Sequence, residues 1–145
     1  MPSHEYEIMY HYPLAIEPGD DTHAFGVEVP DLPGCFSAGE TLGEAIQNAH
    51  EAIHLHLEGL AEDGELPPVP SSPSVYAEDK NYAGYLWGIA SIDETPYLGK
   101  SEKVNVTLPT LLTLKIEEFT KTHKEYRNRS FFLQAAAREF LSKHS

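Results

Sequence analysis

Two histidines one helical turn apart, His50 and His54, flank Glu51 in the stretch HEAIH. In the zinc-protease pattern H-E-x-x-H, such histidines hold a metal ion beside a glutamate that acts as a base. A zinc hydrolase also needs a third protein ligand, but Leu57 and Leu60 stand at the Gly and His positions of the extended motif H-E-x-x-H-x-x-G-x-x-H. We therefore expect an amphipathic helix with solvated histidines, and the zinc hydrolase becomes the minor alternative.

No other motif in the chain assembles a catalytic set. Ser37 lies in GCFSAG, which is not the G-x-S-x-G elbow of serine hydrolases. Cys35 is the single cysteine, which excludes an internal disulfide framework, and the sequence shows no histidine partner for it. The stretch GETLG lacks the lysine of a phosphate-binding loop. The sequence therefore predicts a protein that is not an enzyme and holds no metal ion or cofactor.

The histidine pair belongs to a helix within an α+β body. Four segments rich in aromatic and β-branched residues are bounded by turn signals such as PGDD and DLPG. We expect strands over residues 6–17, 23–30, 35–39 and 85–93. Thr41 opens the helix with the capping box TLGE, and Gly64 stops it after about Asp63. The predicted order of elements in the body is β-β-β-α-β.

One face of this helix is apolar and should pack on the sheet. At about 100° per residue, the apolar stripe contains Leu42, Ile46, Ala49, Ile53, Leu57 and Leu60. Leu55 points away from the stripe among glutamates, which makes it a candidate contact for a partner, although a lone exposed leucine is also ordinary. The proline- and serine-rich run ELPPVPSSPS after the helix predicts a loop or arm.

Charge divides the 145 residues into an acidic body and a basic tail. Residues 1–100 hold 18 of the 23 acidic side chains and two basic ones, whereas residues 101–145 hold eight Lys or Arg and five Asp or Glu. Such asymmetry suggests separate partners, and the basic tail suits nucleic acid. No stretch approaches the ~18 apolar residues of a membrane span, and the start MPSHEYE is unlike a signal peptide. A cytoplasmic protein without membrane contact is expected.

Residues 29–71 carry an ordered series of motifs: a strand, the PDLPGC turn, the TLGEA helix start and the EDGE-Pro exit. This series closely resembles HicB-like antitoxins, and the neighbouring strands extend the resemblance over nearly all of residues 1–98. The resemblance implies a degenerate RNase H-like domain without catalytic carboxylates, which binds and blocks a small HicA-type toxin that cleaves messenger RNA. It also implies repression of the chain's own operon through a C-terminal segment of ribbon-helix-helix or helix-turn-helix type.

The tail combines one predicted strand with two predicted helices. KVNVTL, residues 103–108, alternates apolar and polar side chains as a half-buried strand does. Pro109 then begins a helix, and the break HKEYRN precedes a second one. The apolar faces of the two helices contain Leu112, Ile116 and Phe119, and Leu133, Ala136, Ala137, Phe140 and Leu141. This β-α-α order is that of a ribbon-helix-helix domain, which we assign to residues 99–145.

A solitary strand in so short a segment must find a partner, so we expect a homodimer through residues 103–108. Two antiparallel copies of the strand make a ribbon that fits the DNA major groove. With the valines turned onto the helices, Lys103, Asn105 and Thr107 face outward, where they can read base edges. The other interpretation is that these polar residues form an ordinary solvated strand face.

The tail also resembles ribbon-helix-helix proteins at the residues NRS. By that match Asn128 caps the second helix, and the free amides near Arg129 and Ser130 hold a DNA phosphate. The chain is thus expected to neutralise a toxin with its body and to bind operator DNA with its tail, and dimers could associate further. An orphan ribbon-helix-helix regulator whose body senses another ligand stays open as an alternative, and a short basic protein encoded beside this chain would argue against it.

Overall fold

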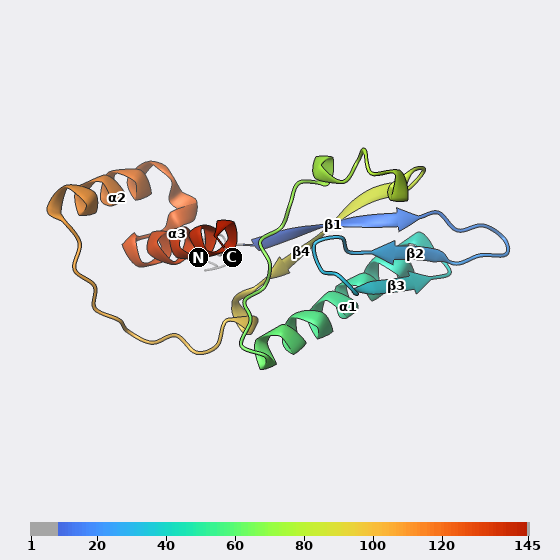
Figure 1. Ribbon diagram of the computed structural model, residues 1–145, viewed down its shortest axis with the longest axis horizontal. Helices are drawn as coiled ribbons and strands as arrows, with labels where there is room; N and C mark the ends of the chain where they lie inside the picture. Colours follow the sequence, from blue (N-terminus) through green and yellow to red (C-terminus); the bar gives the residue numbers. More distant parts are fainter. Residues whose placement is uncertain (1–8, 145) are drawn as a thin grey trace. The chain divides into compact units, whose positions relative to one another are not determined.

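The computed structural model describes residues 9–144. The chain divides into two compact units, one over Met9–Gly99 and one that contains Lys100–Ser145 (Figure 1). None of the described helices combines the length and the apolar character needed to cross a membrane.

An antiparallel sheet with the strand order β3-β2-β1-β4 forms the first unit. The strands are β1 (Met9–Glu17), β2 (Phe25–Glu28), β3 (Phe36–Gly39) and β4 (Leu86–Asp93). β4 follows β1 along its whole length, from the pair Met9 and Asp93 to the pair Ile16 and Leu86. The predicted α+β class and β-β-β-α-β order are therefore confirmed, with strand ends that differ by a few residues. Residues 6–8 of the first predicted strand lie outside the described part of the chain.

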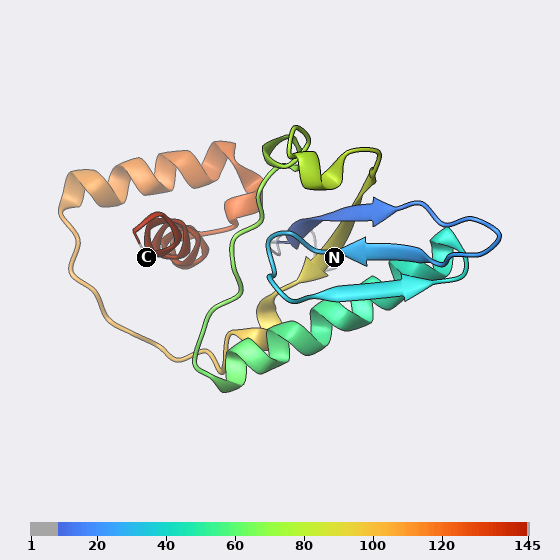
Figure 2. The ribbon, with the colours of Figure 1, turned by 45° about the vertical axis from the view of Figure 1, so that its right-hand side comes forward.

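Helix α1 (Leu42–Glu62) covers one face of the sheet (Figure 2). The predicted cap is confirmed, since Thr41 Oγ1 accepts the amide of Glu44 at 3.1 Å. The predicted apolar stripe is partly wrong: Leu42 is exposed, while Ala45 is fully buried. The reason is a close main-chain approach, because a Cβ on Gly39 of β3 would lie 2.4 Å from the amide nitrogen of Ala45. This contact centres the helix on Ala45 and leaves Leu42, three residues earlier, beyond the packed face.

Strand register decides which side chains face α1. Gly39 lies opposite Phe25, and Val27, two residues further along β2, lies opposite Ile16, so all of them share the α1 face. The neighbouring pair of Ala15 and Trp87 lies on the other face. The segment between α1 and β4 contains two short 3-10 turns, Pro73–Val75 and Lys80–Tyr82, and packs its aromatic rings on Trp87 of that second face. The predicted loop after the helix is thus the second cover of the sheet.

The second unit contains α2 (Thr110–Thr122) and α3 (Arg129–Lys143), joined by the short turn Lys124–Tyr126. Ile116 is its buried side chain within the described residues. The ring of Phe119 packs near those of Tyr126 and Phe132, each with 5.4 Å between centroids. The two predicted helices and the break between them are therefore present.

Candidate functional site

The two histidines of HEAIH lie on α1, and the protein itself supplies partners for both rings. Nδ1 of His50 lies 3.0 Å from the carbonyl oxygen of Ile46, one turn earlier. His54 contacts a carboxylate oxygen of Glu58 at 2.8 Å through Nε2 and the hydroxyl of Tyr97 through Nδ1. Within residues 9–144, no group of three or more His, Cys, Asp or Glu side chains could hold a metal ion together. His54 instead ties α1 to the segment that follows β4.

Tyr97 belongs to the 3-10 turn Thr95–Tyr97 and is buried against α1. Burial raises the pKa of its hydroxyl, and the carboxylates of Glu58 and Asp93 raise it further. The hydroxyl therefore keeps its proton at neutral pH and can donate a hydrogen bond to His54. A neutral His54 with its proton on Nε2 would accept from Tyr97 and donate to Glu58, so this arrangement satisfies all three groups.

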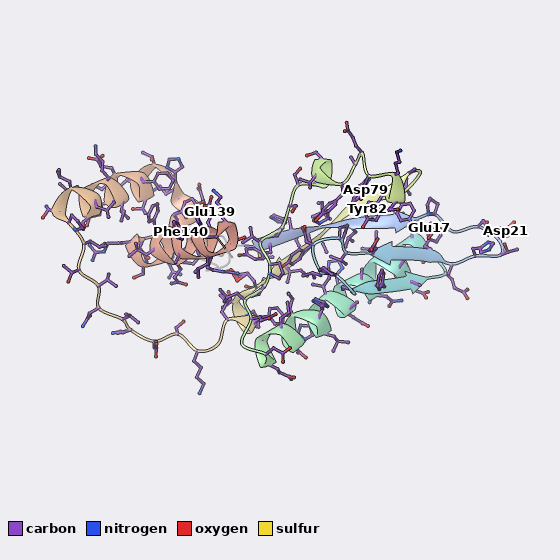
Figure 3. The ribbon with its side chains drawn as sticks, in the orientation of Figure 1. Glu17, Asp21, Asp79, Tyr82, Glu139 and Phe140 are labelled. Carbon is purple, nitrogen blue, oxygen red and sulfur yellow. The ribbon has the colours of Figure 1, made fainter. Side chains whose placement is uncertain are left out.

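Aromatic side chains gather on the sheet face opposite α1. Tyr76 stacks on Trp87 with 6.2 Å between ring centroids, and Tyr82 meets both rings edge-on. Tyr85 adds an edge contact with Tyr82 at 5.6 Å. Figure 3 labels Tyr82 on this unit. The cluster fastens the segment between α1 and β4 to the sheet. The spacing of these aromatic residues before and within the last strand was a usable sequence signal for the cluster, but the predicted site did not include it.

The hydroxyls of this cluster meet carboxylates. Tyr76 donates to Asp31 Oδ1 at 2.5 Å, while the other oxygen of Asp31 accepts the amide of Ser71 at 2.7 Å. Burial raises the pKa of Tyr82 to about 12, and the neighbouring carboxylate of Glu28 contributes to that rise. Protonated hydroxyls of this kind hold and orient carboxylates and do not act as bases near neutral pH.

Leu55, the predicted partner contact, is exposed on α1. Its neighbours Ile53 and Leu57 are fully buried, so the side chain of Leu55 lies on the side of the helix that faces away from the sheet. Glu51 and Glu58, one turn away on either side, are exposed as well. The position matches the expected one, and the role of Leu55 in partner binding stays a prediction.

Residues 103–108 form no strand in the single chain, and their predicted pairing with a second copy stays a prediction. A strand is held by main-chain hydrogen bonds to a neighbour, and no strand within residues 9–144 pairs with this segment. Val104 is 69% and Val106 is 62% exposed, so the valines do not turn onto the helices of their own chain. The three residues predicted to read DNA bases are exposed too: Lys103, Asn105 and Thr107.

The start of α3 places the second group of predicted DNA contacts. Asn128 is the N-cap residue, as predicted, since its Oδ1 accepts the amide of Phe131 at 2.9 Å. Arg129 and Ser130 are the first two residues of α3, and both are exposed. The guanidinium of Arg129 lies 3.5 Å from a carboxylate oxygen of Glu117 on α2. Phosphate binding by these residues stays a prediction.

The C-terminal unit leaves much of its apolar surface open. None of the described residues of α3 is buried in the single chain. The exposed apolar side chains of the unit are Val104, Val106, Leu111, Leu112, Leu114, Phe140 and Leu141. Leu112, Phe140 and Leu141 belong to the predicted apolar faces of the two helices, and they are exposed in the single chain. Leu111 and Leu114 lie outside the predicted stripe of α2, which contained Leu112, Ile116 and Phe119.

Comparison with known proteins shows which family this chain resembles. A family model described as HicB-like antitoxin of bacterial toxin-antitoxin system matches residues 12–137. A protein from the rep-hol intergenic region of Haemophilus phage HP1, named as uncharacterized, is 46% identical over 132 residues, which are 90% of this chain and 98% of the relative.

Two solved structures resemble nearly the whole chain. Antitoxin HicB of Burkholderia pseudomallei superposes with a TM-score of 0.70 at 38% identity, over 90% of this chain and 98% of the relative. Antitoxin HicB3 gives a TM-score of 0.77 at 36% identity, over 89% and 96% of the two chains. Since the family match and these relatives span both units, this protein belongs to the HicB-like antitoxins of bacterial toxin-antitoxin systems.

Proposed function

We propose that this protein binds and inhibits a HicA-type, messenger-RNA-cleaving toxin through residues 1–98, and represses its own operon through a ribbon-helix-helix dimer of residues 99–145. Membership in the antitoxin family supports the first activity. The observation that carries the second is the exposed apolar surface of the C-terminal unit, which includes Val104 and Val106 of a segment with strand-like alternation.

Charge supports a basic partner for the body. Residues 9–99 contain 16 Asp or Glu and a single basic residue, Lys80. A small protein that cleaves RNA must attract phosphates and therefore carries positive charge. An acidic body attracts such a protein and speeds the encounter between the two.

Dimerisation would resolve what the single C-terminal unit leaves unsatisfied. Two antiparallel copies of residues 103–108 would provide each other's main-chain hydrogen-bond partners. The same pairing would turn Val104 and Val106 toward the four helices of the dimer, where the exposed leucines of α2 and Phe140 of α3 could cover them. A homodimer is therefore the arrangement that buries the apolar side chains of this unit.

The dimer would present a polar face to DNA. Lys103, Asn105 and Thr107 alternate with the valines, so burying the valines directs these three side chains outward. Lys can contact guanine and Asn can contact adenine in the major groove. Asn128 already caps α3, and the positive end of that helix beside Arg129 and Ser130 suits a backbone phosphate.

The test of this proposal uses the full-length protein and the DNA upstream of its own gene. We expect a dimer or a multiple of it in sizing chromatography, and a specific gel shift that weakens as salt concentration rises. A monomer with no preference for this DNA over an unrelated duplex would overturn the repressor assignment. An orphan regulator would bind the DNA equally well but would not protect cells from a HicA-type toxin, so the growth of toxin-producing cells separates these two functions.

A further inference from the structure

The outer edge of β4 is the open edge of the sheet. The strand order leaves β3 and β4 as the two edge strands. β4 runs from Leu86 to Asp93 and pairs with β1 over all eight residues in an unbroken register. Its other edge meets no strand among residues 9–144. The main-chain N–H and C=O groups on that side are thus available to pair with a further strand.

The opposite edge of the sheet, β3, is better protected than β4. β3 has only four residues, and α1 packs beside it. The side-chain amide of Asn48 on α1 donates to the carbonyl oxygen of Ala38 at 2.8 Å, so one acceptor of β3 is already occupied. β4 is twice as long, with eight residues, and β1 is the strand that pairs with it among residues 9–144. The contrast singles out β4 as the edge that can accept a strand.

The side chains of β4 lack the devices that usually block edge pairing. The strand LWGIASID contains no lysine, no proline and no bulge, and Asp93 at its end is its one charged residue. Leu86 is 48% and Ile89 is 46% exposed. Because residues at odd spacing point to opposite faces, Leu86 lies on the α1 face and Ile89 on the other. A strand added here would therefore find an apolar side chain on each face.

The charge around β4 indicates which partner would add that strand. A second copy of the body is disfavoured, because each copy has 16 acidic residues and one lysine over residues 9–99. Carboxylates stand at both ends of the edge strand: Asp93 at one end, and Glu17 at the other, where it accepts the Tyr85 hydroxyl at 3.3 Å. The edge thus suits a strand with an apolar middle and basic flanks from a positively charged protein.

We infer that the outer edge of β4 is the docking site for the basic toxin, which adds one of its own strands to the sheet. This inference rests on the proposed function and names the surface through which the body would act. Main-chain hydrogen bonds along β4 would supply affinity, and contacts with Leu86 and Ile89 would fix the register. Asp93 and Glu17 would select for positive charge at the ends of the added strand.

The experiment measures toxin binding by two variants of the full-length protein. Ile89→Lys adds a blocking charge to the open edge, and Phe36→Lys adds the same charge to a 62% exposed position on β3, the protected edge. We expect Ile89→Lys to weaken binding of the purified HicA-type toxin at least about tenfold, because lysine on an edge strand opposes strand addition and repels a basic partner. Phe36→Lys should stay within about threefold of wild type, since the control leaves β4 unchanged.

Hydrogen exchange on the wild-type protein provides a readout that needs no variant. Toxin binding should slow exchange of the main-chain amides in residues 86–93 and leave residues 36–39 unchanged. Equal binding by the two variants, or new protection on β3 without protection on β4, would overturn the edge assignment. The assignment also fails if Ile89→Lys breaks up an oligomer of the toxin-free protein, because the edge would then hold a second copy. If the wild type binds no toxin at all, the proposed function itself fails.

Discussion

At the scale of single residues, both histidines of HEAIH contact groups of the protein itself. His54 bridges Glu58 and Tyr97, so it links α1 to the segment after β4 with protein partners alone. His50 is satisfied by a carbonyl oxygen of its own helix. These contacts give both histidines a role in packing and positioning.

At the scale of single residues, we predict that His50 and His54 bind no zinc ion. Protein washed with chelator should keep its fold, and its thermal midpoint should not change when zinc is added, since the third ligand of a zinc site is missing from the motif. His54→Ala should lower stability by about 0.5–1.5 kcal/mol, the usual net contribution of a lost hydrogen bond. Metal analysis and thermal unfolding check both statements. Stoichiometric zinc that disappears in both His50→Ala and His54→Ala would contradict them.

Asn105 allows a test of base reading. Asn105→Ala should abolish specific operator binding and leave the dimer and toxin binding intact, because the side chain is exposed and alternates with Val104 and Val106. Loss of one good base contact costs about 1–3 kcal/mol, and a symmetric dimer loses it twice. Gel shifts measure the effect, with Asn81→Ala on the body as a matched control. Operator binding by Asn105→Ala equal to that of the control would show that this segment does not read the DNA.

At the scale of elements, the sequence predicted the helices and strands whose signals lie within a short stretch of the chain. The Thr41 cap, the helix that follows it and the four strands were all readable from spacing and turn residues. The burial of Ala45 in place of Leu42 could not be predicted in this way, because it depends on the close approach of Gly39 from β3. The aromatic contact of Tyr76 with Trp87 is equally non-local.

The segment 103–108 shows a different limit of sequence reading. Its alternation predicts a strand, but pairing requires a partner that one chain does not contain. The predicted positions of Asn128 at the helix cap and of the exposed polar residues agree with the structure, whereas their contacts with DNA depend on the dimer. The sequence therefore predicted which residues belong to this site and their order along the chain. It did not predict how these residues are arranged in space.

Val106→Asp tests the ribbon as an element. In the single chain Val106 is 62% exposed and Val75 of the body is 65% exposed, so the two valines are matched in exposure. A carboxylate at position 106 would be buried without a partner in the dimer and should break it, whereas Val75→Asp should have little effect. Sizing chromatography distinguishes a monomer from a dimer. A Val106→Asp protein that stays dimeric would place the dimer contact elsewhere.

At the scale of the whole molecule, the two proposed activities, toxin binding and operator binding, are assigned to two units of opposite net charge. The body has 16 acidic residues and Lys80 over residues 9–99, and residues 101–145 have more basic than acidic side chains. An acidic unit on the same chain opposes non-specific binding to DNA, so the tail must obtain its affinity from specific contacts. Toxin binding and operator binding can thus be carried by separate surfaces.

Growth of cells that produce the cognate HicA-type toxin tests this division most directly. The toxin is co-expressed with the full-length protein, with residues 1–98 alone, or with an empty vector. We expect full-length protein to restore growth and residues 1–98 to restore it at least in part, because toxin binding is assigned to the body. If only the full-length protein restores growth, the tail or its dimer takes part in neutralisation and the division of labour is wrong. Arrest that persists with the full-length protein would contradict the antitoxin function itself.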